Sequence, residues 1–84
     1  MDTFTHHGFQ YDTNAPHGSP FDRGSSDCYY RRLPDPHYYD KTGDKLVRRV
    51  KDEMTPEQIQ EYYAGYEYND MLGDFKDYGQ YDYV

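Results

Sequence analysis

The 84-residue chain has one cysteine, no tryptophan and few aliphatic side chains. Its single Cys28 excludes an internal disulfide and a zinc site built from several cysteines. Leu, Ile, Val and Phe together make 11 of the 84 residues, about 13%, and chains below roughly 20% are commonly disordered. Twelve tyrosines offset this shortage, because each brings a large apolar ring and a hydroxyl that can stay in water. Tyrosine must therefore supply the core.

Long apolar runs and a leader pattern are also missing. No stretch approaches the roughly 18 consecutive apolar residues at which a membrane span is inferred. The first residues lack the basic and then apolar order of a signal peptide. The sequence therefore predicts a soluble, cytoplasmic protein that does not contact membranes.

Positive charge is absent from the first 22 residues and scarce at the other end. The net charge of −7 divides into −3 for residues 1–22, +4 for residues 23–51 and −8 for residues 52–84. An acidic surface repels nucleic acid over a Debye length of about 8 Å at physiological salt. The pattern favours a basic protein or nucleoprotein complex as partner and disfavours direct binding to nucleic acid.

A first helix is predicted to begin at Ser19 and Pro20, which are typical of an N-cap and a first helical residue. It should end near Arg32, because two prolines follow within four residues and each lacks an amide donor. One side of this helix carries small residues, including Gly24 and Cys28. Small side chains would let another backbone approach closely.

A second helix is predicted from the capping box of Thr55 and Gln58, with Pro56 at its first position. Gly65 within it suggests close backbone packing, and Gly73 is a natural C-terminal cap. An apolar stripe recurs at i, i+3, i+4 and i+7: Ile59, Tyr62, Tyr63 and Tyr66. Polar residues fall outside the stripe: Glu57, Gln60, Glu61 and Glu67.

Residues 1–18 show no sustained period, which predicts a flexible N-terminal arm. The aromatic rings of Phe4, Phe9 and Tyr11 also allow the alternative that a strand-like piece of this segment docks on the domain or on a partner. Residues 37–51 are typical of a hairpin, or of a strand beside a loop.

Residues 74–84 alternate Asp with aromatic residues and predict an acidic, Tyr/Asp-rich tail, either solvated or pinned as a strand by Phe75 and Tyr78. Residues 19–73 would then form the small helical domain. The expected fold class is mainly α: two packed short helices with a small β-hairpin or strand, between the arm and the tail.

Eight residues within about 21–69 follow a recognisable spacing: Gly24, Cys28, Arg31, Pro36, Tyr38, Tyr62, Gly65 and Tyr66. This spacing resembles the two-helix pattern of ribosome modulation factor and its small relatives. The resemblance implies two packed helices with a connector, and association with the ribosome. In style, a small, acidic, tyrosine-rich chain is also similar to the products of phage or mobile-element genes, which would place it in the cytoplasm of a host cell.

The chemistry-bearing residues form no recognisable catalytic pattern. The four histidines have no spacing typical of a metal ligand set. No glycine-rich phosphate loop follows a predicted strand, and Cys28 lacks the scaffold of a nucleophile. We therefore expect no enzyme activity, no metal and no cofactor.

The sequence predicts a non-enzymatic acidic protein that occupies a basic, nucleic-acid-binding surface of a host protein or complex and inhibits it. Helical carboxylates three or four positions apart lie about 5–6 Å apart, so two rows would mimic phosphates: Glu53, Glu57 and Glu61, and Asp70, Asp74 and Asp77. The residues predicted to bind the partner are Glu57, Glu61, Glu67, Asp70, Asp74 and Asp77, with Tyr68, Tyr78 and Tyr81 as anchors. A solvated helix face that only keeps the protein soluble is the other interpretation.

The alternative function is that of a modulation factor-like protein that binds rRNA or ribosomal proteins through the central basic segment. The residues that would carry it are Arg31, Arg32, Arg48 and Arg49. These bases are equally consistent with neutralising the protein's own acidic helix. Aromatic surface left uncovered would favour a homodimer.

Overall fold

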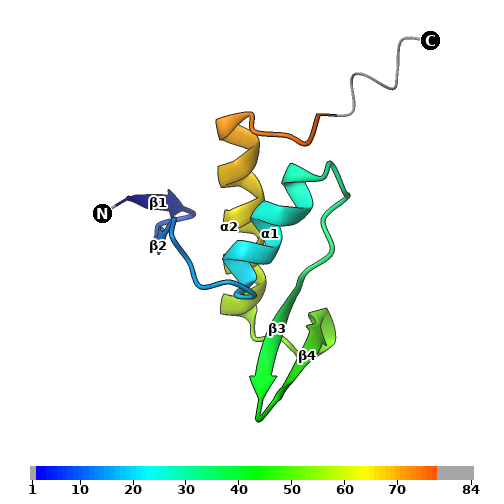
Figure 1. The fold of residues 1–84 in the computed structure, drawn as a ribbon. Coiled ribbons are helices and arrows are strands. Elements are labelled where there is room, and N and C mark those ends of the chain that lie inside the picture. The colour runs from blue at the N-terminus through cyan, green and yellow to red at the C-terminus, as the bar shows by residue number, and fades with distance from the viewer. Residues whose placement is uncertain (1, 78–84) are drawn as a thin grey trace, which may run out of the picture.

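The computed structural model describes residues 2–77, so the predicted anchors Tyr78 and Tyr81 lie outside the described part of the chain. Its elements, in chain order, are β1 (Thr3–His6), β2 (Phe9–Asp12), α1 (Pro20–Tyr29), β3 (His37–Thr42), β4 (Lys45–Val50), a 3₁₀ turn (Lys51–Glu53) and α2 (Pro56–Leu72). Two packed helices and two antiparallel hairpins make a fold with 39% helix and 26% strand (Figure 1). The class is therefore mixed α/β rather than mainly α.

Both helices begin where their capping residues predict. The Ser19 hydroxyl accepts a hydrogen bond from the Asp22 amide at 3.3 Å. Thr55 Oγ1 accepts from the Gln58 amide at 3.1 Å, and Gln58 Oε1 accepts from the Thr55 amide at 2.9 Å. These contacts satisfy amides that have no partner within the first helical turn. α2 ends at Gly73, whose φ of 68° is left-handed and costs glycine little.

α1 and α2 run in the same direction (Figure 1). Their backbones touch at two glycines. A Cβ on Gly24 would lie 1.9 Å from the carbonyl oxygen of Tyr62, and a Cβ on Gly65 would lie 2.0 Å from that of Phe21. Neither position has room for a side chain, because the neighbouring atoms belong to backbone. The close packing predicted at Gly65 is confirmed.

The parallel arrangement forces the chain to return from the end of α1 to the start of α2. Residues 30–36 run back beside the helices, and the β3–β4 hairpin lies toward the start of α2 (Figure 1). Thr42 pairs with Lys45 across a two-residue turn, in which Gly43 has a φ of 62°. Glycine at this position is typical of tight hairpin turns, and the predicted hairpin is confirmed.

The described part of the expected flexible arm, residues 2–18, instead contains β1 and β2, which pair as an antiparallel hairpin that packs on α2 (Figure 1). Its turn residues His7 and Gly8 have φ values of 52° and 84°, as a type I′ turn requires. The ring of Phe4 lies 5.3 Å from the ring of Tyr68. The aromatic residues of this segment also allowed a strand-like piece docked on the domain, and the structure shows that arrangement.

The core is small, and α2 contributes less tyrosine to it than the periodicity predicts. The buried apolar residues are Phe21, Cys28, Met54, Tyr62 and Ala64. Tyr62 is fully buried, whereas Tyr63 is 38% exposed. The contact at Gly65 turns Tyr62 toward α1 and leaves Tyr63 outside. Within residues 2–77, no helix is both long and apolar enough to cross a bilayer.

A buried polar network ties the connector, residues 30–36, to both helices. The Tyr62 hydroxyl donates to Asp27 Oδ2 at 2.5 Å and accepts from the Asp35 amide at 2.9 Å. Asp27 is only 3% exposed, and its Oδ1 accepts from Arg32 at 3.3 Å. Burial, and then the hydrogen bond to the Asp27 carboxylate, raise the pKa of Tyr62, so the phenol keeps the proton that it donates.

Gly65→Ala is expected to lower the free energy of unfolding by about 3 kcal/mol, because the added methyl group overpacks against the Phe21 carbonyl. Helix propensity alone predicts the opposite sign, a gain of about 1 kcal/mol. Urea unfolding followed by circular dichroism measures the change. The control is Gln60→Ala at an exposed position of α2, which should change stability by less than about 0.5 kcal/mol. A stabilised G65A protein would contradict the glycine contact.

Tyr62→Phe is expected to cost about 2 kcal/mol of unfolding free energy, because it leaves Asp27 Oδ2 and the Asp35 amide without their shared partner. The control is Tyr63→Phe, which removes the same hydroxyl from the adjacent, exposed ring. Thermal and urea unfolding of the two variants should differ clearly. Equal stabilities would show that the network contributes nothing.

Candidate partner-binding face

The outward side of α2 carries an inclined row of exposed residues spaced three or four positions apart. This acidic row consists of Glu57, Gln60, Tyr63, Glu67 and Asp70. A rise of 1.5 Å per residue makes the row about 20 Å long. α2 contains no Lys or Arg, so its own sequence does not neutralise the row.

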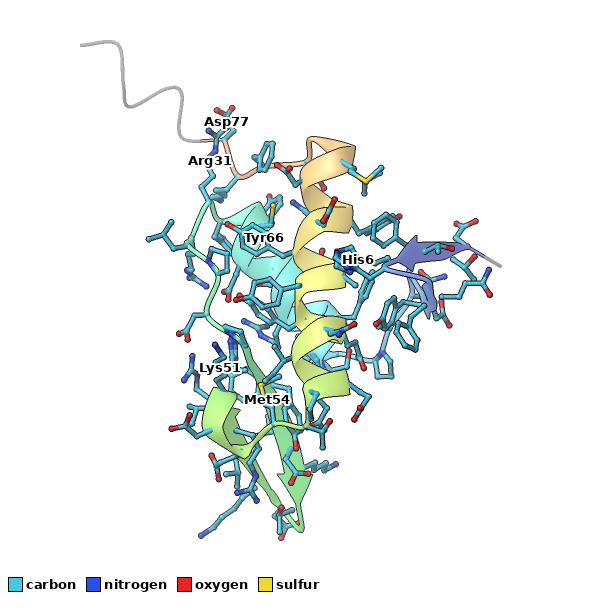
Figure 2. The ribbon with its side chains drawn as sticks, turned by 180° about the vertical axis from the view of Figure 1, so that it is seen from behind. His6, Arg31, Lys51, Met54, Tyr66 and Asp77 are labelled. Atoms are coloured by element: carbon cyan, nitrogen blue, oxygen red, sulfur yellow. The ribbon has the colours of Figure 1, made fainter. Side chains whose placement is uncertain are left out.

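Little positive charge from the rest of the fold reaches the acidic row. Glu57 and Asp70 have no ion pair within residues 2–77. Glu67 Oε2 lies 3.0 Å from His6 Nε2, and this contact is an ion pair only when the histidine is protonated. Figure 2 shows His6 reaching from β1 to α2. Two of the three predicted carboxylates in the row are therefore without a counter-ion.

Two hollows, each of about 210 Å³, adjoin the acidic row and share Gln60. The lining of the first includes Phe9, Tyr11, Pro56, Glu57, Gln60 and Glu61. The second is lined by His6, His7, Gln60 and Tyr63. Phe9 is 58% exposed, so an aromatic ring and two carboxylates face one hollow. A Lys or Arg side chain, with its apolar stem and cationic head, suits such a lining.

Glu61 is half-buried, whereas the periodicity placed it on the outer side of the helix. It precedes Gly65 by four positions and so lies on the side that faces α1. Its Oε2 accepts a hydrogen bond from the Phe21 amide at 3.3 Å, in the first turn of α1. Burial nevertheless raises the pKa of Glu61. Burial, and then the charge of Glu61, raise the pKa of Tyr11 beside it.

The predicted anchor Tyr68 is engaged inside the fold. Its half-buried ring lies 5.3 Å from Phe4 and 5.7 Å from Phe21. Phe9 and Tyr63 are the exposed rings beside the acidic row instead. Sequence reasoning missed Phe9 because its strand was assigned to a flexible arm.

The two predicted helical rows are shorter in the structure than the spacing indicates. Glu53 belongs to the 3₁₀ turn, and Asp74 and Asp77 follow the end of α2 at Leu72, so none of them continues a row on that helix.

Residues 74–77 fold back over the end of α1. Asn69 Nδ2 donates to the Asp74 carbonyl at 2.8 Å, and the Lys76 amide donates to the Tyr29 carbonyl at 2.7 Å. Figure 2 shows Asp77 and Arg31 at this end of the molecule.

Three of the four arginines of the ribosomal alternative pair with carboxylates. Arg32 lies 3.3 Å from Asp27, Arg48 lies 3.1 Å from Asp35, and Arg49 lies 3.4 Å from Asp40 and 3.1 Å from Glu53. Their partners come from α1, the connector, β3 and the 3₁₀ turn, so the arginines do not neutralise α2. Arg31 has a φ of 60° and its guanidinium lies 5.1 Å from the centre of the Phe75 ring.

No group of three His, Cys, Asp or Glu side chains within residues 2–77 is arranged to hold a metal ion. Comparison of the chain with protein-family models, curated proteins and solved structures gives no match. The resemblance to ribosome modulation factor therefore stays a prediction.

Glu61→Gln is expected to raise the stability of the protein at pH 7 and to leave it unchanged well below pH 4.5. The pKa of Glu61 is raised from 4.5 by folding, so the folded state binds the proton more tightly than the unfolded chain. That contribution to stability is complete below the unfolded pKa and is lost as the pH rises through the folded pKa. Glutamine keeps an oxygen for the Phe21 amide and removes the buried charge.

Unfolding free energies measured from pH 3 to pH 8 test this prediction. The matched control is Glu57→Gln, which removes one charge from the exposed start of the same helix. If the two variants follow the same curve against pH, burial of Glu61 is not the cause.

Proposed function

We propose that this protein is a non-enzymatic, acidic interaction protein that covers a basic, nucleic-acid-binding surface of a host protein or nucleoprotein complex and inhibits it. The observation that carries the proposal is the acidic row on α2, whose Glu57 and Asp70 have no counter-ion within residues 2–77. A face of this kind attracts a basic partner and repels free nucleic acid.

Carboxylates on a helix suit the imitation of phosphates. Arg and Lys side chains that bind phosphate also bind carboxylate, and Arg does so through two parallel hydrogen bonds. α2 is capped at both ends and held against α1 at Gly65. Such a preorganised element loses little conformational freedom on binding.

The hollows beside Gln60 supply the apolar part of the interface. Phe9 and Tyr63 are exposed at their edges, and aromatic residues are the commonest anchors of protein interfaces. A cationic side chain of the partner that enters the first hollow meets the carboxylates of Glu57 and Glu61 as well as a ring. The charge of the row speeds association, and the rings hold the complex together.

The ribosomal alternative has weaker support. Arg32, Arg48 and Arg49 already pair with carboxylates of the chain, so contact with rRNA phosphates would compete with those pairs. Phosphate contacts dominate the affinity of proteins for nucleic acid, and few of the basic groups are left for them.

The test is affinity capture from the source cell, followed by measurement of whether the protein displaces nucleic acid from the captured partner. The double variant Glu57→Gln with Asp70→Asn is expected to weaken partner binding about tenfold, because it removes the two unpaired carboxylates of the row. The matched control is Asp44→Asn with Asp52→Asn, which removes two exposed carboxylates near the β3–β4 hairpin and should leave binding within about twofold.

Equal weakening by the two double variants would show that net charge, and not the acidic row, governs binding. Loss of binding in Arg31→Gln with Arg49→Gln, with the row variant unaffected, would instead support the ribosomal alternative.

A further inference from the structure

A larger hollow of about 360 Å³ lies among α1, the connector and the β3–β4 hairpin. Its charged lining consists of Arg23, Arg32, Arg48, Asp27 and Asp35, and Leu33, His37 and Tyr39 complete it. We call this hollow the arginine pocket. The lining itself holds three guanidinium groups and two carboxylates, and the only other carboxylate near them is that of Asp22 at the edge of the pocket.

Two of the guanidinium groups are paired one to one with the two carboxylates. Arg32 Nη1 donates to Asp27 Oδ1 at 3.3 Å, and Arg48 Nη2 donates to Asp35 Oδ2 at 3.1 Å. A guanidinium group has five N–H donors. Each of these contacts uses one donor and leaves others for a ligand.

Arg23 is the guanidinium of the pocket that has no hydrogen-bonded carboxylate. Its side chain is 16% exposed, and the nearest carboxylate oxygen, Asp22 Oδ2, lies 3.8 Å from its Nη1. That distance is too long for a hydrogen bond, and the same oxygen accepts from the Gly18 amide at 2.9 Å. The guanidinium also lies 5.2 Å from the centre of the Tyr39 ring. A mostly buried cation without a hydrogen-bonded counter-ion is costly, and an anion in the pocket would remove that cost.

His37 is held so that it accepts from Arg23 rather than competing for an anion. Its Nδ1 donates to the Asp35 carbonyl at 2.7 Å, and its Nε2 accepts from Arg23 Nε at 3.3 Å. The contact uses Nε–H of Arg23 and leaves its terminal Nη groups for a ligand.

We propose that the arginine pocket binds a small organic phosphate, with the phosphate held by Arg23, Arg32 and Arg48 and the organic part against Leu33 and Tyr39. A phosphate monoester has three terminal oxygens for three guanidinium groups, whereas a carboxylate has two. The pocket volume falls at the lower end of ligand sites, which span about 300–1,000 Å³. Leu33 is 86% exposed, so an organic group that covers it removes apolar surface from water.

The acidic row plays no part in this site, and the inference goes beyond the proposed function. Phenyl phosphate, inorganic phosphate and benzoate titrated into the full isotope-labelled chain test it, with amide chemical shifts as the readout. Phenyl phosphate is expected to shift the signals of Arg23, His37 and Tyr39 saturably and to bind about tenfold more tightly than either other probe. Equal binding of inorganic phosphate overturns the organic part of the proposal, and equal or tighter binding of benzoate overturns the choice of phosphate.

Neighbouring arginines of β4 provide a matched pair of variants. Arg48 lines the pocket, whereas Arg49 pairs with Asp40 and Glu53 and is not part of its lining. Arg48→Gln is expected to weaken phenyl phosphate binding about tenfold, and Arg49→Gln by less than about twofold. Equal weakening would mean that net charge alone attracts the ligand and would overturn the site.

The exposed Leu33 provides a second variant that does not disturb the buried network. Leu33→Ala is expected to weaken binding of phenyl phosphate and to leave binding of inorganic phosphate unchanged, because only the former has a ring to cover it. An unchanged affinity for phenyl phosphate would overturn the contact with Leu33, even if Arg48→Gln were unfolded.

Discussion

The backbones of α1 and α2 touch at Gly24 and Gly65, and this contact sets the rotation of α2 about its own axis. With Gly65 against the Phe21 carbonyl, Tyr62 must point into the core, and Glu61 must lie at the first turn of α1. The opposite side of α2 is then left to solvent and carries the acidic row. A methyl group at either glycine would separate the helices and change all three placements together.

The two helices run in the same direction, so the chain has to return along their length before α2 begins. The returning connector is held by the Tyr62 hydroxyl, which bridges the buried Asp27 carboxylate and the Asp35 amide. This return brings Arg48 of β4 to the same pocket as Arg23 of α1 and Arg32, which follows α1. The arginine pocket therefore exists because the helices are parallel.

Charge is separated in space as well as along the chain. Three arginines of the central segment, Arg32, Arg48 and Arg49, pair with carboxylates within or next to that segment: Asp27, Asp35, Asp40 and Glu53. Ion pairs between residues that lie close in the sequence neutralise these arginines locally, so α2 keeps its negative charge. A small fold thus presents an acidic row on α2 and a pocket lined by three arginines at the connector.

The sequence by itself determined the features that depend on a few neighbouring residues. The caps at Ser19 and Thr55, the stop at Gly73 and the glycine turn of the second hairpin were all predictable, because hydrogen bonds and φ preferences act over two to four positions. Only the tertiary structure decided that β1 and β2 pair, since strands of four residues carry too short an alternation to reveal a buried side. It also decided that Glu61 and Tyr68 are partly buried and that Phe9 and Tyr63 are exposed. Helical periodicity shows which residues share a side, but the contact at Gly24 and Gly65 selects which side is covered.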